Sequence, residues 1–305
     1  MPGGVLLKIL VLGGVSYNLM MDVPEFPTQQ PQTIHAERFR ETLGSTGAGK
    51  SMALKRLGMD VRFHGVIGED RYGDLIRERM NAEQIPFFYD IDPQGTERHV
   101  NLMKRETGER LSIFLQSPSG QIALNEERIE ALIEEADVVF LNIAPYCRRF
   151  LPLLQKHRKS VWCDLHSYDG KSAYFDDFIE HAHVLQFSSD ANPDYEQTMK
   201  TLQQKGKELV ICTHGAEGAS AVNADGQWHS VAGLPYEVVD ANGAGDNFFA
   251  GVLVGRILGH SVEVALRVGA VVAGLCVTSP ELIDQGLSLE KMKQEYARHY
   301  GGGSW

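Results

Sequence analysis

A glycine-rich segment near the C-terminal end carries the residues best suited to chemistry. Residues 240–246 read DANGAGD, and an apolar stretch with helical spacing follows. Glycines let a backbone approach phosphate closely, and amides at a helix start can cradle an anion. A carboxylate there can accept the proton of an attacking hydroxyl. We therefore predict phosphoryl transfer with Asp246 as general base and the backbone of Gly243, Ala244 and Gly245 as anion hole. The alternative is a helix-capping turn with Asp246 as a simple N-cap.

A second glycine-rich segment, residues 44–51 (GSTGAGKS), matches the P-loop pattern letter for letter. A P-loop must directly follow a buried strand, but residues 34–43 carry four charges and make a poor central strand. The sequence favours a glycine-rich turn that opens a helix over 50–57 and contacts a ligand through its backbone. A P-loop NTPase that grips triphosphate with Lys50 is the competing hypothesis.

The elements that must position these segments alternate along the chain. Short apolar runs predict strands at 7–12, 61–66, 138–141, 160–163, 184–187 and 209–212. Between them, helices are predicted at 50–57, 74–81, 126–135, 195–205, 247–258 and 261–276. Such alternation predicts an α/β domain with a mostly parallel sheet covered by helices.

Two stretches interrupt this alternation. Residues 15–42 contain three prolines and little helical periodicity, and residues 96–117 indicate a hairpin, with strands 99–104 and 110–115 around a turn at 107–109. Together they predict a small β lid that excludes water from a transferring phosphoryl group. Its hairpin could pair edge to edge with a second copy.

Bulk composition excludes several other classes of protein. The chain has 305 residues, 43% apolar and 23% charged, with a net charge of -11. An acidic chain is a poor candidate for nucleic-acid binding. The four cysteines are widely spaced and are predicted to be buried and free of metal. The apolar run 5–15 is too short to span a membrane and lacks the features of a signal peptide, which predicts a cytoplasmic protein without membrane contact. Residues 301–305 are predicted to be a flexible tail after a kinase domain over 1–300.

Several motifs together resemble the ribokinase-like (PfkB-type) family of sugar and nucleoside kinases. The segment 240–251 matches the family's D-x-x-G-A-G-D signature, 57–73 is similar to its L-G-x-x-V…G-x-x-G-x-D-x-x-G stretch, and 213–218 to its T-x-G-x-x-G nucleotide loop. Residues 108–110 lie where the family's lid hairpin turns.

The resemblance implies a three-layer α/β/α core with a mostly parallel sheet, a β lid, ATP as donor and Mg²⁺ as cofactor. It implies that Asp246 is the base and that residues 243–245 form the anion hole. It places Thr213, Gly215, Gly218 and Asn242 near the nucleotide. Asp240 is the candidate for the monovalent-cation site that some members carry. Many members are dimers, often through the lid, so a homodimer is the candidate assembly.

The departures from the family pattern concern the acceptor pocket. Gly49 stands where an Asn usually binds substrate, Asn18 stands in place of the usual Asp, and Asp190 is a weak counterpart of the family's metal-linked motif. Asp164 follows a predicted strand and could line the site. The predicted acceptor-binding residues are Ser16, Asn18, Gly44, Ser45 and Gly49.

A neutral pocket would tolerate an anionic acceptor better than a carboxylate would. Lys50, Arg98 and Lys104 could serve such a ligand, although each is expected to be a solvated surface charge. The sequence therefore predicts an ATP-dependent kinase that acts on a hydroxyl of a small sugar-like molecule. A nucleoside kinase, or a ligand-binding protein on the same scaffold with catalysis lost, is the alternative.

Overall fold

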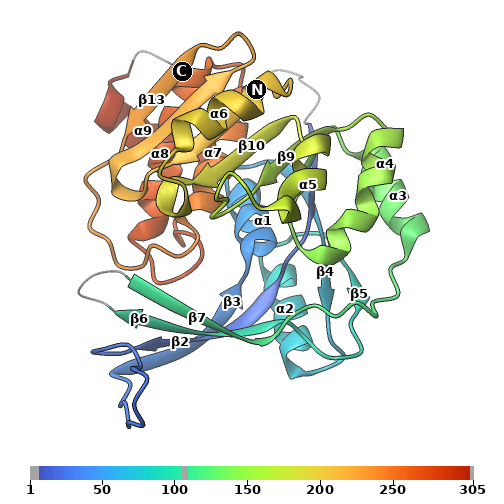
Figure 1. Ribbon diagram of the computed structural model, residues 1–305, viewed down its shortest axis with the longest axis vertical. Coiled ribbons are helices and arrows are strands. Elements are labelled where there is room, and N and C mark those ends of the chain that lie inside the picture. Colours follow the sequence, from blue (N-terminus) through green and yellow to red (C-terminus); the bar gives the residue numbers. More distant parts are fainter. Residues whose placement is uncertain (1–6, 105–108, 303–305) are drawn as a thin grey trace.

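The computed structural model describes residues 7–104 and 109–302. The predicted turn at 107–108 and the last three residues of the predicted tail lie outside these ranges. The described chain forms a large sheet between two helical layers, with a smaller sheet projecting from one end (Figure 1).

The large sheet has the order β13-β12-β11-β10-β9-β8-β1-β4-β5. Pairing is parallel from β5 to β11, and β12 and β13 add an antiparallel edge. Its strands are β1 Lys8–Leu12, β4 Asp60–Ile67, β5 Phe87–Ile91, β8 Val138–Leu141, β9 Ser160–Asp164, β10 Val184–Ser188, β11 Leu209–Thr213, β12 Gly218–Asn223 and β13 Trp228–Ala232.

Helices cover both faces of this sheet because its central strands are apolar on both sides of the pleat. In β1, Ile9 and Val11 enter one core, whereas Leu10 and Leu12 enter the other. The first core is closed by α1 Thr46–Arg56, α2 Arg71–Ala82, α7 Ala244–Ile257, α8 Val262–Val277 and α9 Leu289–Tyr300. The second is closed by α3 Glu126–Glu135, α4 Leu151–Lys156, α5 Asp176–His181 and α6 Tyr195–Gln204.

The smaller sheet, called the lid sheet below, consists of β2 Ser16–Asp22, β3 Arg38–Gly44, β6 Arg98–Lys104 and β7 Glu109–Gln116. Its order is β3-β2-β6-β7, with only the β2–β6 pair parallel. The predicted α/β/α core with a β lid is confirmed. Strands predicted from apolar runs agree with the structure to within about a residue or two, as expected for element ends.

Helix α7 is packed so tightly that its start is fixed. Nearly all of its length is buried, and Gly251 faces Gly269 of α8 so closely that an added Cβ would lie 2.9 Å from the Gly269 Cα. The helix begins at Ala244, three residues before the predicted start, with Gly243 as N-cap at a φ of 84°. The glycine loop is thus part of the first helical turn, which orients its amides.

Candidate active site

Asp246 lies in the first turn of α7, within the core rather than on the surface. The first four amides of a helix have no intrahelical acceptor and carry its positive end. The Ala244 amide donates to the Ala241 carbonyl at 3.2 Å. Gly243 and Gly245 are therefore the amides best placed to receive an anion. Their proximity to Asp246 is the arrangement that a phosphoryl-transfer site needs.

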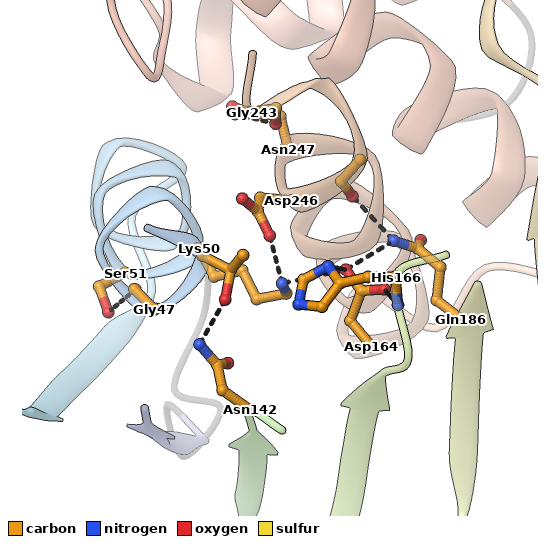
Figure 2. A network of polar contacts seen from close by, with 12 residues as sticks. Gly47, Lys50, Ser51, Asn142, Asp164, His166, Gln186, Gly243, Asp246 and Asn247 are labelled. Atoms are coloured by element: carbon orange, nitrogen blue, oxygen red, sulfur yellow. Dashed lines mark hydrogen bonds and ion pairs between the residues drawn. The ribbon is translucent and has the colours of Figure 1, made fainter. Parts of the chain in front are cut away.

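Lys50 is buried against Asp246, with a side chain only 1% exposed. Its ammonium pairs with Asp246 Oδ1 and lies 3.2 Å from Asp164 Oδ2, so one lysine joins α1, α7 and β9 (Figure 2). The expectation of a solvated charge is wrong for this residue. All residues from Gly47 to Leu54 are buried, and a charge inside such a helix must be paired.

The three charges alter one another's protonation. Burial raises the pKa of the Asp246 carboxyl above its ordinary value, and the neighbouring Asp164 adds to this effect against the opposing charge of Lys50. Burial opposes ionisation of Asp164 as well, yet Lys50 holds the pKa of Asp164 below its ordinary value. Burial also opposes the charge on Lys50, but the two carboxylates outweigh it and raise the Lys50 pKa. Asp246 is thus the carboxyl better suited to take up a proton.

The second oxygen of Asp246 faces Gly49. A Cβ added at Gly49 would lie 3.3 Å from Asp246 Oδ2, and no other described atom comes closer. Even a Cβ at position 49 would be tightly packed against this oxygen, so the glycine lets the carboxylate lie close to α1. Lys50 therefore holds Oδ1 while Oδ2 faces Gly49.

Further contacts hold the surrounding loops. Gln186 of β10 donates to the Gly245 carbonyl at 3.0 Å and to Asp164 at 3.2 Å, and Asn247 donates to the Gly243 carbonyl at 2.9 Å (Figure 2). Asn142, at the end of β8, bonds the Thr46 hydroxyl at the start of α1. These amides fix the two helix starts relative to the sheet.

A cavity of about 930 Å³ lies beside the start of α7. It is lined by Ala244 and Gly245, by residues of the lid sheet, and by the predicted nucleotide residues Thr213, Gly215 and Gly218. Asp190 and Asp240 also line it. Asn242, the fourth predicted nucleotide residue, instead accepts a hydrogen bond from Arg110 of the lid sheet at 2.5 Å.

The predicted acceptor residues lie together where β2 and β3 meet α1. The Asn18 side chain is buried, and its oxygen accepts from the His99 amide at 3.0 Å. The Ser16 hydroxyl is buried without a hydrogen-bond partner among the described residues. Cβ atoms added at Gly44 and Gly14 would collide with Asn18 and Ser45 respectively, so these glycines allow the close packing.

The sheet topology excludes the P-loop hypothesis. Residues 44–51 follow β3, a strand of the lid sheet, and not a central strand of the parallel sheet. The Lys50 ammonium points at two carboxylates. Arg98 and Lys104 are largely covered and form ion pairs with Glu41 and Glu25.

An α/β/α fold with a β lid and a carboxylate beside a glycine-rich helix start is the arrangement expected of a small-molecule phosphotransferase. The family model of the pfkB family carbohydrate kinases matches residues 6–288. The chain therefore belongs to the PfkB family of carbohydrate kinases, which are ATP-dependent phosphotransferases.

Individual relatives agree with this family. The chain is 31% identical over 281 residues to acarbose 7(IV)-phosphotransferase of Actinoplanes sp., covering 89% of this chain and 92% of that protein. A 5-dehydro-2-deoxygluconokinase of Listeria monocytogenes is 22% identical, covering 84% and 86%. A solved microbiome-derived acarbose kinase superimposes with a TM-score of 0.86 at 26% identity, covering 96% of this chain and all (100%) of that one.

The described structure bears on the predicted cysteines and on membrane-spanning helices. The four cysteines are buried and free. No helix among residues 7–104 and 109–302 is long and apolar enough to cross a membrane. Gln186 and Asn142 were not predicted as site residues, and Lys50 was considered only as a P-loop lysine or as a partner of an anionic acceptor. Of these three residues, only Lys50 stood out in the sequence, because its charge lies within a run of small and apolar residues.

Proposed function

We propose that the protein transfers the γ-phosphoryl group of ATP to a hydroxyl of a sugar, with Asp246 as general base. The observation that carries this proposal is the orientation of Asp246. Lys50 holds one oxygen, and the other faces Gly49 beside the first turn of α7.

In the reaction, the acceptor hydroxyl beside Gly49 loses its proton to Asp246 Oδ2 as its oxygen bonds to the γ-phosphorus. The bond from the γ-phosphorus to the β–γ bridging oxygen breaks, and ADP leaves. The amides of Gly243 and Gly245 stabilise charge on the transferring group. Lys50 keeps the carboxylate oriented, and the lid sheet keeps water out.

The cavity suits a nucleotide because Thr213 and Gly215 line its polar side and Ala270, Ala273 and Val277 an apolar side. Mg²⁺ bound with ATP would neutralise phosphate charge in this cavity. Asp190 is the lining carboxylate that would reach the ion or its waters.

Acarbose is the first acceptor to test, because two relatives that each match most of the chain are named for it. The names of these relatives support a sugar rather than a nucleoside as the acceptor. The experiment is a thermal-shift screen with Mg·ATP across acarbose, simple sugars, sugar acids, sugar phosphates and nucleosides, followed by mass spectrometry of each stabilising compound.

A ligand at 100 times its dissociation constant adds about 2.7 kcal/mol to stability, which such a screen detects. A stabilising sugar that gains one phosphate supports the proposal. Stabilisation by a sugar without any phosphorylated product would favour a non-catalytic ligand-binding protein instead. If only nucleosides give a hit, the acceptor is a nucleoside rather than a sugar.

A further inference from the structure

Three side chains of the lid sheet bond either the loop that precedes α7 or residues 280–281. Arg40 of β3 donates from one guanidinium nitrogen to Asp240 Oδ2 at 2.8 Å and to the Pro280 carbonyl at 2.7 Å. Thr42 of the same strand donates to Glu281 at 3.0 Å, and Arg110 of β7 to Asn242 at 2.5 Å. All four hydrogen bonds join the lid sheet to residues 240–242 or 280–281.

Asp240 presents the ligand chemistry of a cation site. The Asp240 side chain is buried, and its Oδ1 accepts from the Asn242 amide at 2.8 Å. Its Oδ2 and the Pro280 carbonyl both contact the same nitrogen of Arg40. A carboxylate and a carbonyl around a single point are oxygen ligands that hard cations accept. The Arg40 nitrogen occupies that point. A monovalent cation at Asp240 therefore does not fit this arrangement.

The same two loops support the predicted anion hole. The Val239 and Asp240 amides donate to the Val277 carbonyl at 2.7 and 3.2 Å. Asn247 donates to the carbonyls of Gly243 and Leu282, the latter at 2.8 Å. A displacement of loop 280–282 would therefore move Gly243, and Arg40 lies between that loop and Asp240.

We propose that Arg40 is a built-in cation: it neutralises Asp240, joins loops 240–243 and 280–282, and makes a bound monovalent ion unnecessary. Because Arg40 belongs to the lid sheet, its link between the two loops exists only while β3 lies against them. Arg40 is thus a positioning residue for the phosphate-binding turn. Its effect on turnover rests on the proposed function, but its role as a cation can be tested on the folded protein alone.

The direct test compares thermal unfolding in potassium chloride and in choline chloride at equal concentration. For the wild type we expect midpoints that agree to within about 1 °C, since no potassium is bound. For Arg40→Met, which keeps the aliphatic stem, we expect a lower midpoint in choline and a rise of about 2 °C or more on adding potassium. A wild type that potassium stabilises would overturn the proposal, as would a folded Arg40→Met protein indifferent to potassium.

Two further variants separate charge from lid contact. Thr42→Val removes a neighbouring lid contact but keeps Arg40, so it should gain no response to potassium. Arg40→Lys keeps the charge and should also stay indifferent to potassium, which keeps the proposal testable if Arg40→Met does not fold. Potassium sensitivity in either variant contradicts a role for the Arg40 charge.

Turnover supplies the second readout. Wild-type kcat should not change when choline replaces potassium, whereas kcat of Arg40→Met should fall about tenfold in choline through misplacement of the loop, and recover with potassium. Restoration by potassium is a result that a merely structural arginine would not give. If no acceptor is found, the proposed function fails, while the unfolding experiment still decides the role of Arg40.

Discussion

The start of α7 is contacted from two sides that differ in burial. On the core side, the side chains of Lys50 and Asp164 are almost fully covered. Lys50 forms ion pairs with both Asp246 and Asp164. On the lid side, the Arg40 side chain is 30% exposed, and Phe39 beside it is 76% exposed. Buried charges must keep their partners, and this also holds for Asp240, whose side chain is only 6% exposed and loses its charge partner if Arg40 moves away. The core-side contacts are thus the more deeply buried, whereas the lid-side contact is made through a partly exposed arginine.

The largest expected effect comes from removing the base on the core side. Asp246→Asn keeps the size of the side chain but cannot accept the acceptor proton, so kcat should fall about a thousandfold. Stabilisation by ATP in thermal unfolding should persist, because the cavity is unchanged. A variant with kcat close to that of the wild type would mean that the buried side does not set the chemistry.

The second test removes the charge that holds Asp246. Lys50→Met leaves two buried carboxylates unpaired and should lower the free energy of unfolding by about 3–5 kcal/mol. It should also raise the pKa of Asp246, on which Asp164 and His166 also act. Since the base works deprotonated, the acidic limb of the kcat/KM profile should move to higher pH by about one unit or more.

The control for this change is the double variant Lys50→Met with Asp164→Asn. Removing the second carboxylate relieves the repulsion, so the acidic limb should return toward lower pH. If the limb stays where it is in both variants, the buried charges do not tune the base.

A third change probes the packing beside the base. Gly49→Asn adds a side chain whose Cβ alone would lie 3.3 Å from Asp246 Oδ2, so it crowds the base. We expect KM to rise about tenfold for a bulky acceptor, the loss of roughly one good contact, with a smaller change for a small sugar. Gly49→Ala is the matched control for added volume. An equal rise in KM for all acceptors would show that Gly49 does not determine which acceptor is preferred.

The smallest effect on chemistry is expected at the outer edge of the lid sheet. β7 is an edge strand with Ile113, Phe114 and Leu115 exposed, a surface suited to a second copy of the chain. Ile113→Lys should shift the protein from dimer to monomer in analytical ultracentrifugation with little change in kcat. A wild type that is already monomeric at working concentration would reject the predicted homodimer.

What sequence could predict follows the same division between the two sides. The apolar runs of the parallel strands and the DANGAGD segment indicate their structure locally, because burial and glycine geometry leave few alternatives. Lys50 could not be placed this way: its letters match a P-loop, and its partners Asp164 and Asp246 lie 114 and 196 residues away. Arg40 likewise meets Asp240 only through the pairing of β3 in the lid sheet. Long-range charge pairs depend on the finished fold.

The central claim is that the γ-phosphoryl group passes directly to a sugar hydroxyl. The most direct measurement uses ATP whose γ-phosphoryl oxygens carry a heavy isotope, with mass spectrometry of the products. The account predicts that the label appears in a phosphorylated sugar in step with ADP formation. Label found only in inorganic phosphate, with the sugar unchanged, would contradict it.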